Sequence, residues 1–505
     1  MLGGRLPDKL PRVKRSLPPC NLIGFHVSSK ELQIRGVLVA LGCAFALPAH
    51  AADGLAARLD AVLASPGLRG ARVAALVVER DDGRELYTRD PDRPMIPASN
   101  LKLLTALAAL EAFGPTHQFR TDLLTDAAPD AHGAVARLML RGGGDPALTS
   151  EDVWRLAADV RRAGVERVRD GLLLDDGAFD RERWHPSWGA VSARAYHAPI
   201  SALTVNYGAL GVTLIPGAAP GDPVRVMLDP PVPFFRLTNR ATTGSRRVHN
   251  ALEVERRAGD GVENVLVSGV APAGSPAQTV YRSVLDPTRY FGAVLRMQLE
   301  ANGVHVAGDI AMGPVPPDAA PLLGFEGRSL AEIVRLFLKY SNNEIGEGLV
   351  KALAARTTAG GATWKEGIGA VRALLEQAGL DTGRITLVDG SGLSYENRVA
   401  PRILVAALRI GTGSFRYGPE LLAALPIAAA DGTLEKRASS VANAVRAKTG
   451  LLTSVTGLSG LAQCADGRVV FFSVLVNGFR GSAEAAMDAL DRFVSVLVAS
   501  SSESR

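Results

Sequence analysis

Cysteine is scarce in this chain of 505 residues, which contains only Cys20, Cys43 and Cys464. The first two lie in an N-terminal segment that we expect to be removed, so the mature chain keeps one thiol and forms no intramolecular disulfide. Cys464 lies between two stretches of alternating polarity that read as the strands of a hairpin. A buried structural thiol is therefore expected there, rather than a nucleophile.

Long apolar runs are also scarce. Residues 36–51 (GVLVALGCAFALPAHA) form one, which is too short to span a bilayer, follows several basic residues and ends in the A-x-A pattern Ala49-His50-Ala51. These features predict a signal peptide over residues 1–51, cleaved near Ala51, and a soluble protein exported to the periplasm. The alternative is a lipoprotein anchored through Cys43, for which ALGC is a poor recognition site.

The excess of positive charge lies in the same N-terminal segment, residues 1–51. The chain carries 56 basic and 51 acidic residues, a net charge of +5, and residues 1–51 alone hold seven basic and two acidic residues. The remainder is neutral, so nucleic acid is not expected as a partner. Histidine is rare, with eight residues and no H-E-x-x-H or comparable cluster. This disfavours a zinc peptidase, and neither a metal nor a cofactor is expected.

The whole chain is 47% hydrophobic, an ordinary globular composition, and its length suits two or three domains. Residues 72–90 predict a β-hairpin that turns at Asp82-Gly83. A helix is then expected with Ser99 at its N-cap and its end near Phe113, before Gly114-Pro115.

From about residue 120 to 317, short strand-like runs alternate with turns rich in Gly, Pro and Asp. One helix, over residues 286–303, is expected to close this region. Helical segments, two or three strands and a C-terminal helix follow. The pattern predicts an α/β (α+β) protein in which two mixed parts enclose a β-rich block, an insertion if the outer parts form one domain.

Lysine is scarce as well, because arginine supplies most of the positive charge, yet Lys102 lies on the apolar helix three residues after Ser99. Positions i and i+3 share a helix face, so the amine can reach the Ser99 hydroxyl. Serine needs a base in contact to act as a nucleophile, and burial would lower the pKa of the amine enough for that role. The alternative is an N-cap serine beside a lysine that extends to solvent.

Two further motifs follow. Ser341-Asn342-Asn343 lies between helical runs, where a short loop could present polar side chains; a surface turn is the alternative. Lys448-Thr449-Gly450 follows a strand-like run, and its lysine and threonine could hold a carboxylate; an exposed strand end is the alternative. Gly450 would let a substrate backbone approach the strand closely.

Taken together and in this order, S-x-x-K, S-x-N and K-T-G resemble the signature of penicillin-binding proteins and serine β-lactamases. The long spacing between the first two motifs is similar to that of the low-molecular-mass class C penicillin-binding proteins. These are D-alanyl-D-alanine carboxypeptidases/endopeptidases of the PBP4 (DacB) type, peptidase family S13. Further stretches share the resemblance: GGGDPAL (142–148), HAPISALTVN (197–206), VDGSGLSYENRVAP (388–401) and LPIAAADGTLEKR (425–437).

The resemblance implies a role for each motif residue. Ser99 would attack the carbonyl between the terminal D-alanines of a peptidoglycan stem peptide, and Lys102 would take its proton. Ser341 would relay a proton to the leaving amine, and Asn343 would position Lys102 and the substrate amide. The acyl-enzyme would then be hydrolysed by water, and penicillins would acylate the same serine.

The third motif would bind substrate. Lys448 and Thr449 would hold the C-terminal carboxylate, beside Gly450 and Leu451. The backbone N–H groups of Ser99 and Leu451 would form the oxyanion hole.

Three positions depart from the family pattern. Leu451 stands where relatives often carry Ser or Thr, and Tyr395 stands where relatives that bind diaminopimelate carry an arginine, a loss that Arg398 cannot be assumed to repair. The stretch WGAVSARAYHAP (188–199) lacks the acid found in those relatives. These departures affect the side-chain specificity rather than the D-Ala-D-Ala chemistry.

The resemblance implies a transpeptidase-like domain made of residues 52–119 and 318–505, with a β-rich insertion at 120–317 that contains two nested subdomains. Peptidoglycan stem peptides and β-lactams are the expected partners, together with a peripheral membrane or cell-wall complex or a homodimer. Two alternatives stay open: a serine β-lactamase, which would turn penicillin over rapidly, and a catalytically idle cell-wall scaffold protein.

Overall fold

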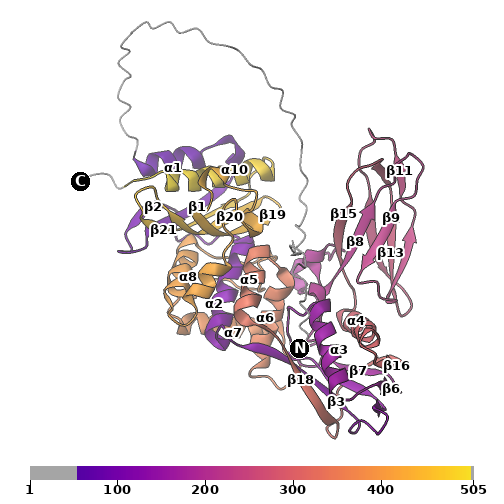
Figure 1. Cartoon of the computed structure of the whole chain (residues 1–505). Helices are drawn as coiled ribbons and strands as arrows, with labels where there is room; N and C mark the ends of the chain where they lie inside the picture. The colour runs from indigo at the N-terminus through magenta and orange to yellow at the C-terminus, as the bar shows by residue number, and fades with distance from the viewer. Residues whose placement is uncertain (1–53, 502–505) are drawn as a thin grey trace, which may run out of the picture.

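In the computed structural model, which describes residues 54–501, one half of the molecule is built around a five-stranded antiparallel sheet (Figure 1). The strands come from both ends of the described chain and are ordered β19-β20-β21-β1-β2. Their bounds are β1 (Arg72–Glu79), β2 (Glu85–Arg89), β19 (Val445–Leu452), β20 (Val455–Gln463) and β21 (Val469–Asn477). The pairing of β1 with β21 therefore joins the two ends of the chain in one core.

Helices cover both faces of this sheet. The helices α1 (Leu55–Leu63) and α10 (Ala483–Val498) lie on one face (Figure 1). Alternate residues of β1 divide between the two layers: Val73, Ala75 and Val77 pack under α1 and α10, whereas Ala74, Leu76 and Val78 face the larger helical layer. That layer contains α2 (Lys102–Phe113), α5 (Leu330–Tyr340), α6 (Asn343–Ala355), α7 (Trp364–Gln377), α8 (Pro401–Gly413) and α9 (Gly418–Ala424).

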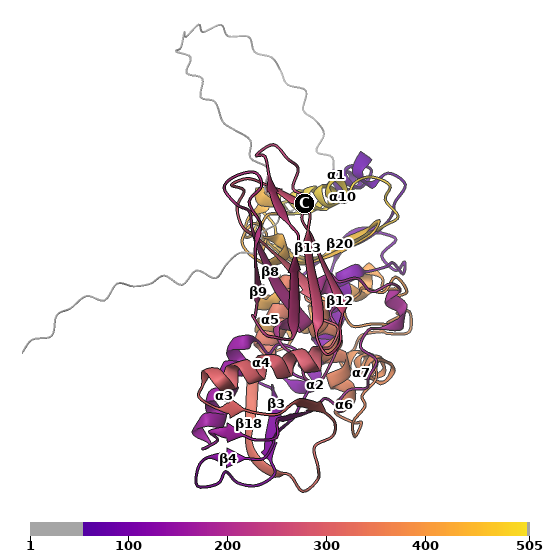
Figure 2. The same cartoon turned by 90° about the vertical axis from the view of Figure 1, so that its right-hand side faces the viewer.

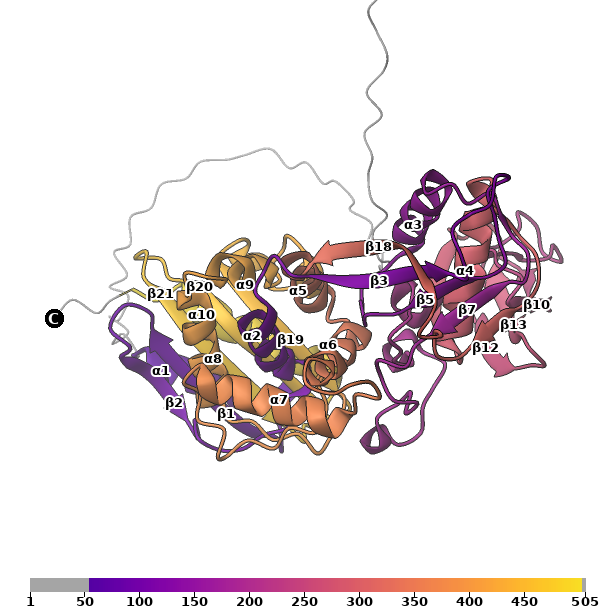
Figure 3. The ribbon, with the colours of Figure 1, turned by 90° about the horizontal axis from the view of Figure 1, so that it is seen from below.

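The helix α2 lies at the centre of this layer. Every residue from Lys102 to Leu110 is buried, which explains why the segment is apolar on all sides. The chain then leaves through β3 (Gln118–Thr125) and returns through β18 (Ala320–Ser329), and these two strands pair antiparallel (Figure 3). The chain therefore passes from the first half to the second through β3 and returns through the neighbouring strand β18.

Beyond this crossing lies a five-stranded sheet ordered β17-β7-β5-β3-β18, packed against α3 and α4, and a small sheet ordered β16-β6-β4. Figure 2 shows the outer strands standing above α4. The bounds here are β4 (Ala134–Val135), β5 (Leu138–Arg141), α3 (Ser150–Arg162), β6 (Arg167–Val168), β7 (Leu172–Asp175), α4 (Pro287–Ala301), β16 (His305–Val306) and β17 (Ile310–Met312).

The outermost part consists of two three-stranded sheets, β15-β8-β9 and β10-β13-β12, and the short pair β11-β14. Its strands are β8 (Ala209–Ile215), β9 (Arg225–Asp229), β10 (Phe235–Asn239), β11 (Thr242–Gly244), β12 (Glu253–Ala258), β13 (Glu263–Ser268), β14 (Val270–Pro272) and β15 (Gln278–Ser283). The expected α/β (α+β) fold with a large β-rich insertion is therefore confirmed.

Several local expectations are also met. The β1–β2 hairpin turns at Asp82-Gly83, and α4 begins after Asp286, whose carboxylate accepts a hydrogen bond from the Arg289 N–H at 3.0 Å. Cys464 is buried at the turn between β20 and β21. The predicted signal peptide lies outside the described residues. Within residues 54–501, no helix combines the length and apolarity that a membrane crossing requires.

Two expectations were wrong. The region 120–317 contains a second long helix, α3, which begins with a capping box formed by Thr149 and Asp152. Ser99 is not the N-cap of α2: it lies in a 3₁₀ turn, η2 (Ala98–Leu101), and α2 itself begins at Lys102.

Candidate active site

Ser99 and Lys102 lie where η2 passes into α2. Ala98, directly before the serine, adopts a left-handed backbone with φ of 47°, a conformation that costs a non-glycine residue roughly 1–3 kcal/mol. The surrounding structure holds this turn in place, because Ala98 is fully buried. The strained turn replaces the expected N-cap and fixes the direction in which the Ser99 side chain points.

The Lys102 amine is completely buried and surrounded by three acceptors. Nζ donates to Ser99 Oγ at 2.9 Å, to Asn343 Oδ1 at 2.7 Å and to the Ser391 carbonyl at 2.7 Å. Burial lowers the pKa of Lys102 from 10.5 to about 7, against the opposing influence of Asp389 and Glu347. An amine with such a pKa can take a proton from the serine near neutral pH.

The second motif lies at the junction of α5 and α6. Ser341 ends α5 in a left-handed conformation, and Asn342 caps α6 by accepting a hydrogen bond from the Ile345 N–H. Asn343 then bonds Lys102 through its oxygen and donates from Nδ2 to the Tyr196 carbonyl at 3.0 Å. The motif is therefore joined to Lys102, and the surface-turn interpretation does not hold.

The third motif lies within the edge strand β19. Lys448 is fully buried and donates from Nζ to Ser341 Oγ at 2.9 Å. Burial, and then the charge of Lys102, depress the pKa of Lys448 well below its usual range. Thr449 bonds Thr433, and the Leu451 side chain is about half exposed beside them. The eight predicted site residues thus meet at one place: Lys102 is bonded to Ser99, Lys448 is bonded to Ser341, and both serines line the same cavity.

Gly450 has a structural reason in addition to the expected one, which stays a prediction. A Cβ built there would lie 2.5 Å from Asn100 Nδ2 and 3.0 Å from the Pro97 carbonyl oxygen. Contacts this short do not occur between real atoms, so the glycine lets η2 pack against β19. In this structure the close approach is made by the turn that carries Ser99.

Replacement of Gly450 by alanine is therefore expected to displace Ser99 and to slow acylation by penicillin about 100-fold, because small misplacements of a reacting group have effects of that order. The rate of acylation measures this. Gly369→Ala is the matched control, since Gly369 lies in α7 with open space around its Cβ position. Equal rates for Gly450→Ala and Gly369→Ala would contradict the prediction.

A segment between β7 and β8 forms one wall of the site. Trp188 donates from Nε1 to Asp389 Oδ2 at 3.0 Å, and Ser187 donates to Ser394 Oγ at 2.8 Å. The carbonyl of Tyr196 accepts the bond from Asn343. The resemblance had connected residues 188–199 with side-chain specificity, but none of these residues was predicted as part of the catalytic site. The segment lies 85 or more residues from each S-x-x-K and S-x-N position, and tertiary folding brings it there.

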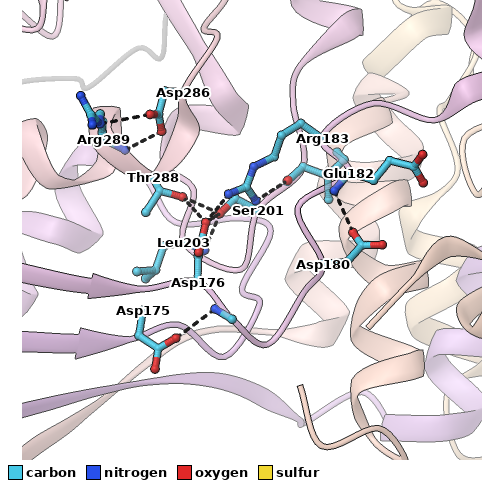
Figure 4. A network of polar contacts seen from close by, with 12 residues as sticks. Asp175, Asp176, Asp180, Glu182, Arg183, Ser201, Leu203, Asp286, Thr288 and Arg289 are labelled. Carbon is cyan, nitrogen blue, oxygen red and sulfur yellow. Dashed lines mark hydrogen bonds and ion pairs between the residues drawn. The ribbon is translucent and has the colours of Figure 1, made fainter. Parts of the chain in front are cut away.

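The base of this wall is held by a polar network (Figure 4). The Asp176 carboxylate pairs with Arg183 and accepts hydrogen bonds from Thr288 at 2.7 Å and Ser201 at 3.2 Å. Asp180 pairs with Lys351 of α6 at 2.5 Å, which joins the segment to the helical layer. The wall is thus bonded to α4 through Thr288 and to α6 through Lys351.

A cavity of about 740 Å³ opens beside Ser99. Tyr395 extends across it and accepts a hydrogen bond from the Thr453 N–H at 3.0 Å, whereas Arg398 is directed at the carbonyls of Tyr395 and Asn397. The cavity lining has no charged side chain: Ser99, Trp188, Tyr196, His197, Ser341, Asn343, Gly392, Leu393, Tyr395, Leu451, Leu452, Thr453, Ser454, Phe479, Gly481 and Ala483.

Comparison with known proteins agrees with this geometry. Residues 55–497 match the D-Ala-D-Ala carboxypeptidase 3 (S13) family. The chain is 39% identical to a D-alanyl-D-alanine carboxypeptidase of Actinomadura sp. over 85% of this chain and 82% of that protein. It is 26% identical to the carboxypeptidase DacB of Haemophilus influenzae over 76% of this chain and 81% of that protein.

A solved structure shows the same fold. Penicillin-binding protein 4 (dacB) from Haemophilus influenzae superposes with a TM-score of 0.73 at 24% identity, covering 86% of this chain and 97% of that one. The match spans both the central sheet and the inserted strands. Because the family match extends over nearly the whole described chain, this protein belongs to the D-Ala-D-Ala carboxypeptidase 3 (S13) family.

Proposed function

We propose that the protein is a serine D-Ala-D-Ala carboxypeptidase/endopeptidase that acts on peptidoglycan stem peptides and is inhibited covalently by penicillins. The observation that carries this proposal is the position of the buried Lys102 amine, 2.9 Å from Ser99 Oγ, with a pKa of about 7. Family membership supports the choice of substrate.

The reaction begins at Ser99. Lys102 accepts the hydroxyl proton while Oγ forms a bond to the carbonyl carbon between the two D-alanines. The N–H groups of Ser99 and Leu451 stabilise the oxygen that becomes negative. Asn343 keeps Lys102 in place through its bond at 2.7 Å. The site thus supplies a nucleophile, a base and an oxyanion hole.

Collapse of the tetrahedral intermediate breaks the bond to the leaving D-alanine. Ser341, which accepts a hydrogen bond from Lys448 at 2.9 Å, donates its hydroxyl proton to the leaving nitrogen. The proton that Lys102 took from Ser99 replaces it, so Lys102 is neutral again when D-alanine leaves. Lys448 and Thr449 bind the terminal carboxylate, and Gly450 and Leu451 form the adjoining strand edge. Water then attacks the acyl carbonyl while Lys102 accepts its proton. Lys102 returns this proton to Ser99 Oγ as the acyl–oxygen bond breaks, which releases the shortened peptide and free Ser99.

The same proposal includes the division of the chain and its location. Residues 52–119 and 318–505 form the catalytic domain, and 120–317 form an insertion with two subdomains; the paired crossing strands β3 and β18 support this division. Export to the periplasm follows from the substrate. Association with a cell-wall complex or a second copy is part of the proposal, whereas nucleic acid is not a partner.

Labelling with a fluorescent penicillin tests the function. A covalent label that persists for hours, together with release of D-alanine from a peptide ending in D-Ala-D-Ala, is the expected result. A label that disappears within seconds while penicillin is consumed would identify a β-lactamase instead. Folded protein that neither takes the label nor releases D-alanine would overturn the catalytic proposal and favour a scaffold role.

A further inference from the structure

Two buried carboxylates flank the loop that holds Lys102. Glu347 lies on α6, four residues after Asn343, and Asp389 begins the loop that continues to Ser394. Both side chains are completely buried. Neither is part of the three motifs, so neither has a role in the mechanism as described above.

Glu347 binds the backbone of this loop. Oε1 accepts a hydrogen bond from the Ser391 N–H at 2.8 Å, and Oε2 accepts from the Gly390 N–H at 3.0 Å. Oε2 also accepts from Trp364 Nε1 at 2.8 Å. All three partners are donors, and these bonds favour the ionised carboxylate. Burial, and then the charge of Asp389, act in the opposite direction and raise the pKa of Glu347 to about 7.

Asp389 is bound in the same way. Oδ1 accepts from the Gly392 N–H at 2.8 Å and from Asn397 Nδ2 at 2.9 Å. Oδ2 accepts from the Ser394 N–H at 2.7 Å and from Trp188 Nε1 at 3.0 Å. Four donors thus surround this side chain, two at each oxygen.

The loop between the two carboxylates presents its carbonyl groups to α2. The Ser391 carbonyl accepts the bond from Lys102 Nζ at 2.7 Å, and the Gly390 carbonyl accepts from Thr105 Oγ1 at 2.7 Å. Glu347 therefore acts on Lys102 through a single peptide segment. The Glu347 carboxylate binds the N–H groups of Gly390 and Ser391, and the carbonyl of Ser391 binds the Lys102 amine.

The two carboxylates also act on Lys102 through their charge. Burial of an unpaired charge is unfavourable, and the charges of Asp389 and Glu347 raise the pKa of the fully buried Lys102 amine against the effect of its burial. The titratable groups that face this region from the surrounding elements are Lys102, Lys448, Glu347, Asp389, Lys351 over Trp364, and His185 against the same indole.

We propose that Glu347 and Asp389 are positioning residues for Lys102, which shape the 389–394 loop around the amine and supply the negative charge that sets the pH at which the amine becomes a base. This inference rests on the proposed role of Lys102 as the general base. Burial lowers the pKa of Lys102 and the two carboxylates raise it. Removal of either charge should therefore lower that pKa further.

The rate of acylation by penicillin, measured from pH 5 to 9 for the wild type, Glu347→Gln and Asp389→Asn, tests the proposal. The acidic limb of the pH–rate profile is the range in which the rate of acylation rises with pH. In both variants this limb is expected to move to lower pH by about one unit, the size of shift that a nearby opposite charge produces. The rate on the plateau is expected to fall about 10- to 100-fold, because the loop that holds Lys102 loses a contact. Two variants on different elements keep the test usable if one of them does not fold.

Glu344→Gln is the matched control. Glu344 lies on the same helix and is also buried, but neither carboxyl oxygen has a hydrogen-bond partner among the described residues. Burial, and then the charge of Asp145, raise the pKa of Glu344 well above its ordinary value. The acidic limb of this variant should coincide with that of the wild type. A limb shifted equally in Glu344→Gln would overturn the proposal, because it would show a general effect of replacing a buried carboxyl group on α6.

Two further outcomes separate this inference from the proposed function. Folded Glu347→Gln and Asp389→Asn proteins that lose rate without any movement of the acidic limb would reduce both residues to a structural role and overturn the inference. A wild type that is not acylated at any pH would instead overturn the proposed function, and the inference with it.

Discussion

Ser99→Ala is expected to lose covalent penicillin labelling and to release D-alanine about 10⁵-fold more slowly than the wild type, a loss typical for removal of a nucleophile. Ser99 Oγ is the hydroxyl that lies 2.9 Å from the Lys102 amine. The substitution removes one oxygen atom and leaves the bonds from Lys102 to Asn343 and Ser391 in place. Intact-protein mass after incubation with penicillin measures the acylation directly.

Ser341→Ala is the informative comparison, because Ser341 also lies in the cavity and bonds a buried lysine. That variant should still form the acyl-enzyme, at a rate about 100- to 1000-fold lower, since proton transfer in this position is general acid-base assistance. If Ser341→Ala abolished the label while Ser99→Ala retained it, the two serines would have exchanged roles.

The site could be predicted from the sequence because its chemistry is local to three short motifs. Lys102 follows Ser99 by one helical turn, and a lysine within an otherwise apolar helix has few explanations. The strained Ala98 turn could not be predicted in this way. Its left-handed backbone is stabilised by packing against β19, 350 residues away in the sequence, and Gly450 is the residue that permits that packing.

In the fold, too, elements with local sequence signals could be predicted, whereas those that depend on long-range contacts could not. The apolar β20 and β21 and the capped helix α4 were predictable from local patterns. The missed helix α3 had a local signal, since Thr149 and Asp152 form a capping box ahead of an apolar stripe at Val153, Leu156 and Val160. The wall containing Trp188 had no such signal, because its place depends on long-range bonds to Asp389 and Asn343.

The pH dependence of acylation follows from the burial of Lys102. An exposed lysine would remain protonated up to about pH 10.5, whereas burial lowers this pKa to about 7. Only the deprotonated amine can take the Ser99 proton, so the rate should rise with pH, reach half of its maximum near pH 7 and level off above pH 8. A rate that stays constant from pH 5 to 9 would contradict this assignment.

Lys102→Arg should abolish this rise of the acylation rate with pH, because a guanidinium keeps its proton throughout the range from pH 5 to 9. The acylation rate is expected to fall about 10⁴-fold at pH 8 and not to recover at pH 9, since general base catalysis contributes up to that factor. Lys365→Arg, at an exposed position of α7, should retain both the rate and the limb of the wild type. At pH 8 arginine preserves the positive charge at residue 365, whereas at residue 102 it replaces a neutral amine by a permanent cation. The pair of variants therefore distinguishes the loss of the titratable base from a general effect of replacing a lysine by arginine. Recovery of Lys102→Arg at high pH would show that another group can accept the Ser99 proton.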